Sequence, residues 1–145
     1  MIQLSKILCP TDFSDTSDKA VRYAIEFARR VNAHVRFLHI QAPDVTIIRN
    51  VGEDESPLSE GFTRLLMAEK KKGLMADVKV VNGVPTEAII SHAHDWFADL
   101  IIMGSHGRTG LMRLMMGSVA EAVFRSVAIP VLLVKQDAVD KAIPG

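Results

Sequence analysis

The sequence DLIIMGSHGRTG, residues 99–110, joins a continuous apolar run to a loop rich in glycine. An uninterrupted run such as Asp99–Met103 is typical of a central parallel strand that helices cover on both faces. The glycines that follow indicate a turn at the end of that strand. A helical segment, Ser118–Ser126, comes after the loop, with Ser118 as its predicted N-cap. The stretch therefore predicts a strand–loop–helix unit of an α/β fold.

The same alternation of strand and helix extends over the rest of the chain. Short runs of β-type residues predict four further strands, at Lys6–Pro10, His34–Ile40, Asp77–Val81 and Val131–Val134. Apolar residues at helical spacing predict helices over Ala20–Val31, with Thr16 or Ser17 as N-cap, over Leu58–Leu74, and from about Pro85. Strands that alternate with helices imply a parallel sheet with right-handed crossovers.

We therefore predict a single α/β domain over residues 1–145. Its sheet is Rossmann-like and doubly wound, with five parallel strands in the order 3-2-1-4-5 and helices on both faces. In such a sheet, ligands bind outside the carboxyl ends of the strands at which the winding reverses. Here those ends, of the first and fourth strands, are followed by Pro10-Thr11-Asp12 and by Gly104-Ser105-His106-Gly107. These two segments are the predicted ligand site.

Composition excludes several kinds of partner. The 145 residues are 48% hydrophobic and 23% charged, the balance of a globular chain. Lysine plus arginine equals aspartate plus glutamate, 17 each, so nothing indicates nucleic acid or an anionic membrane as a partner. We find no signal peptide at the N-terminus, and the apolar run Val127–Val134 is too short to span a membrane. We expect a cytoplasmic protein, in which Cys9 is a small buried hydrophobe.

The glycine-rich loop is the segment that carries chemistry. Four glycines, Gly104, Gly107, Gly110 and Gly117, lie between the buried strand and the helix that begins near Ser118. Glycine lets a ligand approach the backbone closely, and successive N–H groups in such a loop form a concavity for an anion. The N-terminus of the following helix favours a phosphate at the same place. The P-loop lysine is missing, and no Gly-x-Gly-x-x-Gly follows the first strand. The loop therefore predicts an anion cradle of another type.

These residues resemble the universal stress protein family. The spacing Gly104-x-x-Gly107, nine residues, Gly117-Ser118 is similar to the ATP-binding signature of that family. The resemblance covers nearly the whole chain, and its other parts are Lys6–Ser14, Gly83-Val84-Pro85, Ala98–Gly104 and Ile129–Val134. Each part is weak alone, but together and in this order they are specific.

The resemblance implies a role for particular positions. Adenine is expected near Pro10, Thr11 and Ile40, with Asp12 beside the ribose or a phosphate-bound metal. Met103, Gly104 and Ser105 are expected on the ribose side. Residues around the phosphates are expected to be Gly107, Arg108, Gly117, Ser118 and Val119. His106 is expected either to contact the ligand or only to shape the loop, and Asp12 also suits a cap of the turn into the first helix.

Three functional hypotheses follow. The first is an ATP-binding, stress-response regulator that holds Mg²⁺ or Mn²⁺ through the phosphates. The resemblance implies homodimers that pair through Val131–Val134, an apolar edge strand that would otherwise be exposed. The second is a slow ATP-hydrolysing or phosphoryl- or nucleotidyl-transferring enzyme, with charge from Arg108 and Arg113 and water oriented by His106 or Asp12. The third is an interaction module that does not use nucleotide.

Four histidines and one long loop are not assigned to the ligand site. His34 and His39 are expected to be strand residues without a special role. His92 and His94 lie two apart on a helix and make a poor metal pair. The loop Gln41–Pro57 is polar and turn-rich, and is interpreted as a mobile surface excursion, either a lid or an idle loop.

Overall fold

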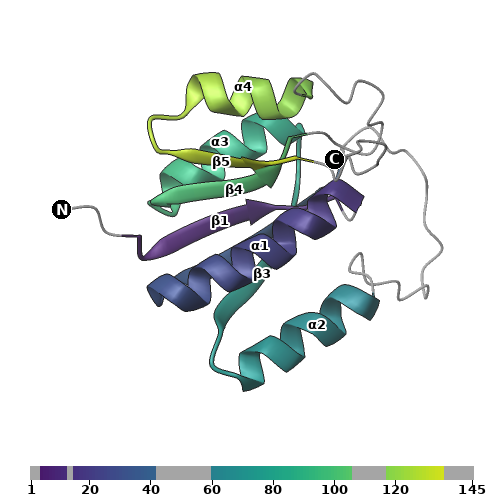
Figure 1. Ribbon diagram of the computed structural model, residues 1–145. Coiled ribbons are helices and arrows are strands. Elements are labelled where there is room, and N and C mark those ends of the chain that lie inside the picture. Colours follow the sequence, from purple (N-terminus) through teal and green to yellow (C-terminus); the bar gives the residue numbers. More distant parts are fainter. Residues whose placement is uncertain (1–3, 13–14, 42–59, 106–116, 136–145) are drawn as a thin grey trace, which may run out of the picture.

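The computed structural model describes residues 4–12, 15–41, 60–105 and 117–135. Within these ranges, strands and helices alternate along the chain as predicted (Figure 1). The strands are β1 (Lys6–Pro10), β2 (His34–Gln41), β3 (Met75–Asn82), β4 (Leu100–Gly104) and β5 (Val131–Val134). The helices are α1 (Asp15–Val31), α2 (Glu60–Lys71), α3 (Pro85–Asp95) and α4 (Ser118–Ser126). The predicted loop Gln41–Pro57 lies, apart from Gln41 itself, outside the described residues.

The five strands form one parallel sheet in the order β3-β2-β1-β4-β5, which confirms the predicted topology. The winding reverses between β1 and β4, where Ile7 pairs with Leu100 and Leu8 with Ile101. On the other side of β1, Pro10 pairs with Leu38 of β2. The carboxyl ends of β1, β4 and β5 lie toward the right-hand side of Figure 1, and α4 begins on that same side.

Each face of the sheet carries its own hydrophobic core. Helices α1 and α2 cover one face, where Ile7, Val35 and Phe37 are fully buried. Helices α3 and α4 cover the other face, where Leu8 and Ile101 are fully buried. Figure 1 shows the two helix pairs on opposite sides of the strands. Because both faces are covered, β1 and β4 are buried along most of their length, as the continuous apolar runs predicted.

Two predicted helix caps are wrong. Helix α1 begins at Asp15, so Thr16 and Ser17 lie within its first turn and neither is the N-cap. The apolar period begins only at Ala20, because the residues of the first turn are polar and give no hydrophobic signal in the sequence. In α4 the N-cap is Gly117, with extended φ and ψ of −67° and 158°, and Ser118 is the first helical residue. Helix α2 ends at Lys71 instead of Leu74, and Gly73 turns the chain out with a φ of +106°.

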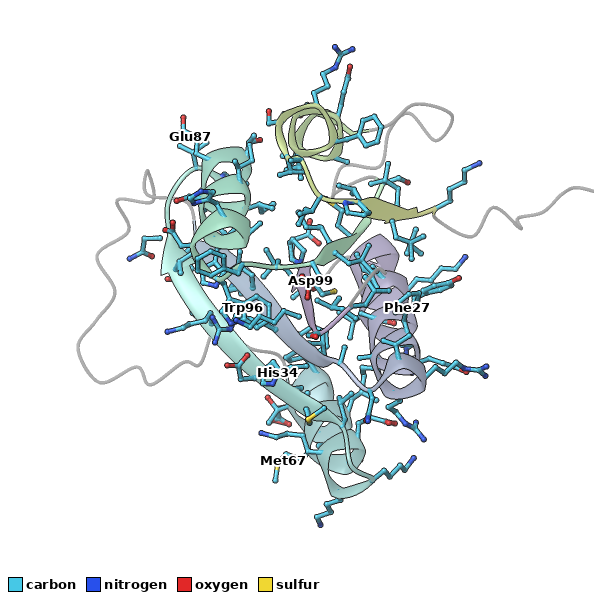
Figure 2. The ribbon with its side chains drawn as sticks, turned by 90° about the vertical axis from the view of Figure 1, so that its left-hand side faces the viewer. Phe27, His34, Met67, Glu87, Trp96 and Asp99 are labelled. Carbon is cyan, nitrogen blue, oxygen red and sulfur yellow. The ribbon has the colours of Figure 1, made fainter. Side chains whose placement is uncertain are left out.

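Asp99 joins the starts of the two central strands. Its Oδ2 atom accepts hydrogen bonds from the backbone N–H groups of Ser5 and Lys6, each over 2.9 Å. Its own N–H donates to the Lys6 carbonyl over 2.8 Å. Figure 2, which looks onto the amino ends of the strands, shows Asp99 at this junction.

Arg36 joins β2, β3 and α3 near the amino ends of the strands. Its Nε and Nη2 atoms form a two-pronged ion pair with the carboxylate of Asp77 on β3, over 3.0 and 2.8 Å. The guanidinium lies over the ring of Trp96, 4.4 Å from its centroid. His34 meets the same ring edge-on, with centroids 5.8 Å apart (Figure 2). The guanidinium lowers the pKa of the Asp77 carboxyl below its usual range.

Candidate functional site

A cavity of about 260 Å³ opens at the carboxyl ends of β1 and β4. This is the position that the topology predicts for a ligand, because the winding of the sheet reverses between these two strands. Three segments far apart in the sequence form its walls, namely the turn after β1, the end of β4 and the start of α4. Side chains from β2 and α3 complete the lining.

The first wall is the segment Pro10–Asp12. The N–H of Thr11 donates to the Leu38 carbonyl over 2.9 Å, so the turn after β1 stays attached to β2. The ring of His39, also on β2, lies with Nδ1 3.2 Å from the Thr11 carbonyl oxygen. Thr11 is buried at this point, because only 7% of its surface is exposed. The backbone of the turn is therefore held on both sides of Thr11.

The second wall is formed where the chain leaves β4 and where it later returns. Ser105 donates its N–H to the Val134 carbonyl over 2.9 Å, so it continues the pairing of β4 with β5. The N–H of Gly117 donates to the Ser105 carbonyl over 2.6 Å. This hydrogen bond joins the end of β4 to the residue that precedes α4, and both Ser105 and Gly117 line the cavity.

The N-terminus of α4 forms the polar end of the site. The first intrahelical bond runs from the Glu121 N–H to the Gly117 carbonyl over 2.9 Å. The N–H groups of the three residues between them have no acceptor within the helix, as at any helix start. Those residues, Ser118, Val119 and Ala120, all line the cavity. Their N–H groups and the helix dipole favour a negative charge there.

The remainder of the lining is mainly apolar. It comes from both sides of the crevice, and its members are Pro10, Leu38, Ile40, Pro85, Ile89, Met103 and Ala120. Leu38, Ile89 and Met103 are at most 5% exposed and belong to the core that α3 and α4 cover. The site therefore combines an apolar surface, suited to a flat ring, with a helix N-terminus suited to an anion.

The cavity brings together most of the residues that the sequence predicted. These are Pro10, Thr11, Asp12, Ile40, Met103, Gly104, Ser105, Gly117, Ser118 and Val119. The predicted residues His106, Gly107 and Arg108 lie outside the described residues, as does Arg113. Sequence reasoning did not assign Leu38, Pro85, Ile89 or Ala120 to the site. Pro85 belongs to the segment Gly83-Val84-Pro85, which is part of the family resemblance. For these four residues, this was the one sign in the sequence of a place in the site.

His39 also has a contact that the sequence did not predict. Both His34 and His39 lie in β2 as expected, but the His39 ring touches the backbone of the cavity wall. His92 and His94 have different partners: Nε2 of His92 lies 3.3 Å from Arg36 Nη1, and Nδ1 of His94 lies 3.3 Å from Asp95 Oδ1. Burial raises the pKa of the Cys9 thiol, which is fully buried as predicted.

The described parts of the chain contain neither a metal-binding cluster nor a membrane-spanning helix. Across residues 4–12, 15–41, 60–105 and 117–135, no three His, Cys, Asp or Glu side chains gather in a way that could hold a metal ion. No helix within the same ranges is both long enough and apolar enough to cross a membrane.

Comparison of the sequence with known proteins identifies one family. The profile of the universal stress protein family matches residues 3–135. The universal stress protein MJ0531 of Methanocaldococcus jannaschii is 36% identical over 143 residues, which cover 90% of this chain and 82% of that protein.

Two solved structures agree with this family match. The structure of protein MJ0577, from the same organism, is 35% identical with a TM-score of 0.72 and covers 94% of this chain and 99% of its own. A universal stress protein solved in complex with cAMP is 26% identical, also with a TM-score of 0.72, and covers 93% of this chain and 99% of its own.

Proposed function

The chain belongs to the universal stress protein family, and from that premise we propose that it binds an adenine nucleotide, with ATP as the foremost ligand. We further propose that it acts as a cytoplasmic homodimer that regulates a stress response. The nucleotide-loaded and nucleotide-free forms would differ in the surface that they present to partner proteins. ATP is then a signal that the protein detects instead of a substrate that it consumes.

The observation that carries the proposal is the convergence of two unlike surfaces in one cavity. The apolar side chains of Pro10, Ile40 and Met103 suit the flat adenine ring. The N-terminus of α4 suits the phosphates, and lies in the lining of the same cavity. A volume of about 260 Å³ lies just below the range of small-molecule pockets, which span roughly 300–1,000 Å³.

Asp12 is the one charged side chain in the cavity lining that the structure describes. A carboxylate next to phosphates repels them unless a cation lies between, whereas beside a ribose it accepts hydrogen bonds from hydroxyl groups. Both positions agree with an ATP that carries Mg²⁺ or Mn²⁺ on its phosphate oxygens and water. We assign Arg108, Gly107 and His106 to the phosphate side by the family motif alone.

The complex of a related universal stress protein with cAMP supports adenine nucleotides as the ligand class. ATP and cAMP share the adenine and the ribose, and differ in the length and charge of the phosphate. Titration with ATP, AMP and cAMP, each with and without Mg²⁺, therefore tests which phosphate the α4 end accepts. Micromolar or tighter binding of any of them supports the proposal, and no binding of all three overturns it.

Gly117 provides the variant that tests where the phosphates lie. Its φ of −67° is open to any residue, so Gly117→Leu adds a side chain at the cavity without backbone strain. Leucine is a poorer N-cap than glycine, by about 1 kcal/mol, which leaves the fold intact. We expect ATP affinity to fall by more than about tenfold in calorimetric titration.

Gly61→Leu is the matched control for this experiment. Gly61 lies in α2 and does not line the cavity, and a Cβ atom added to it would have nothing within 4 Å. Its ATP affinity should equal that of the wild type. If Gly117→Leu and the wild type bind ATP with equal affinity, the phosphates do not lie at the N-terminus of α4.

An ATPase assay with the purified protein distinguishes a regulator from an enzyme. If it releases phosphate from ATP at about 1 per second or faster, the rate of an ordinary enzyme, the binding-only proposal fails. Mass spectrometry of small molecules released on denaturation adds the ligand that the protein carries from the cell. An unmodified adenine nucleotide in that fraction is the expected result.

A further inference from the structure

The structure places a histidine ring behind the cavity wall, on the far face of the sheet. Side chains of a strand alternate between its two faces. On β2, Leu38 and Ile40 lie on the cavity face, whereas Val35 and Phe37 belong to the core under α1 and α2. His39 lies two residues after Phe37 and four after Val35, so its side chain is on the same face of β2 as theirs. That face is opposite the cavity.

From that face, the ring reaches the backbone of the cavity wall. Nδ1 of His39 lies 3.2 Å from the carbonyl oxygen of Thr11. A carbonyl oxygen only accepts hydrogen bonds, so Nδ1 has to carry a proton for this contact to be favourable. The contact therefore selects the ring that is protonated at Nδ1, in either its neutral or its charged form. His92 shows the opposite arrangement, because its Nε2 faces a donor, Nη1 of Arg36.

The contact fixes the plane of the peptide between Thr11 and Asp12. A trans peptide is planar, and its C=O and N–H groups point in opposite directions. The described peptides include no cis bond, so this geometry applies here. When the Thr11 carbonyl turns toward His39, the Asp12 N–H turns the other way, toward the cavity face. Thr11 has little freedom besides this, because its own N–H is bonded to Leu38 over 2.9 Å.

We propose that His39 is a positioning residue for the ligand, since its Nδ1–H holds the Thr11–Asp12 peptide in the orientation that aims the Asp12 backbone N–H at the cavity. The inference rests on the proposed nucleotide function and goes beyond it, because His39 does not line the cavity. Without the ring, this peptide loses the restraint on its carbonyl oxygen, and a bound nucleotide has to supply part of that orientation itself.

The test uses two substitutions of nearly equal shape. His39→Asn places an amide N–H close to the position of Nδ1, whereas His39→Leu has the same branching and no donor. We expect His39→Leu to weaken ATP binding about tenfold, the effect of one hydrogen bond of ordinary strength. His39→Asn should bind ATP within about threefold of the wild type. His94→Leu, which replaces a ring on a side chain 87% exposed, is the control and should leave affinity unchanged.

The outcomes separate this inference from the proposed function. If the wild type binds ATP and His39→Leu binds it equally well at the same Mg²⁺ concentration, the inference is overturned and the function stands. If His39→Asn and His39→Leu lose affinity equally, the ring fills space and does not position the peptide. If the wild type binds no nucleotide, the proposed function fails on its own.

A second measurement tests the inference without any ligand. Long-range ¹H–¹⁵N correlation spectra of the wild type show which ring nitrogen of His39 carries the proton. We expect the neutral ring to carry its proton on Nδ1. A ring protonated only at Nε2 overturns the inference, whatever the titrations show and whether or not the variants fold.

Discussion

At the scale of single residues, Asp99 ties together the two central strands at the end opposite the cavity. One carboxylate oxygen accepts two backbone N–H groups, from Ser5 and Lys6, while the Asp99 N–H bonds the Lys6 carbonyl. Hydrogen bonds to a charged acceptor are stronger than those between neutral groups. Asp99 therefore fixes how β1 and β4 start relative to one another, and with them the two cavity walls at their far ends.

We expect Asp99→Ala to lower the free energy of unfolding by about 2 kcal/mol, because two backbone N–H groups lose a charged acceptor. Asp99→Asn keeps an acceptor oxygen of the same shape and should lose about half as much. Urea denaturation of both variants measures the difference. Equal losses would show that the charge, and not the acceptor geometry, accounts for the effect.

At the scale of elements, Arg36 is the point where a strand, its edge neighbour and a helix meet. It pairs with Asp77 of β3, lies over Trp96 just after α3, and donates from Nη1 to Nε2 of His92 over 3.3 Å. His92 can accept this bond only while Nε2 is unprotonated. Burial first, and then Arg36 and Lys79, lower the pKa of the His92 ring.

This arrangement makes the packing of α3 sensitive to acid. The pKa of His92 is about 6.5 in the unfolded chain and lower in the fold, so the unfolded chain takes up the proton first as pH falls. Stability is then full above about pH 6.5 and is lost as the pH falls from there toward the folded pKa. The nearby carboxylates of Asp95 and Asp77 oppose the shift without cancelling it.

His92→Gln tests this pH dependence, because glutamine keeps an acceptor near the position of Nε2 and does not titrate. Between about pH 7 and pH 5 the wild type should lose more stability than His92→Gln. Thermal melts at half-unit pH steps measure both curves. His94→Gln, which replaces an exposed ring, is the control; if it flattens the curve equally, Arg36 is not the cause.

The sequence was a good guide to elements and a poor one to the contacts between them. The continuous apolar runs of β1 and β4 predicted their central position, and from that the topology rule located the cavity. The start of α1 was missed because a polar first turn shows no period. The contacts of His39 and Arg36 were missed for another reason. Each joins residues that are distant in the chain, and periodicity carries no information about such pairs.

At the scale of the whole molecule, the two edges of the sheet differ in character. Edge strand β3 carries Asp77 and Lys79, and a lysine on an edge opposes pairing with another sheet. Edge strand β5 reads Val-Leu-Leu-Val, and its first three residues are only half-buried. This contrast supports the proposal that the homodimer forms through Val131–Val134.

The register of β5 allows the dimer to be separated from the fold. Ile101 pairs with Val131 and donates to the Pro130 carbonyl over 3.1 Å, so in a parallel ladder the Leu132 N–H faces β4. The Leu133 N–H then faces the free edge. We expect Leu133→Pro to give a folded monomer in analytical ultracentrifugation, because proline removes a donor only on the outer side.

Leu132→Pro is the matched control, since it removes the N–H that faces β4. It should destabilise the monomer itself by about 1–3 kcal/mol, because a carbonyl group of β4 loses its hydrogen-bond donor. A Leu133→Pro protein that remains dimeric would place the interface on another surface. A wild type that is monomeric at all concentrations would remove the homodimer from the proposal.

The central place of β1 has a consequence for how the chain is made. The Lys6 N–H and the Asp99 carboxylate that accepts it are 93 residues apart in sequence. On a ribosome, β1 and β2 therefore emerge well before β4 is available, and one edge of the buried strand β1 remains unpaired until then. Contacts of such high sequence separation slow folding and prolong the exposure of unpaired strands. We expect the nascent chain to depend on chaperones chiefly in the interval between the synthesis of β2 and that of β4.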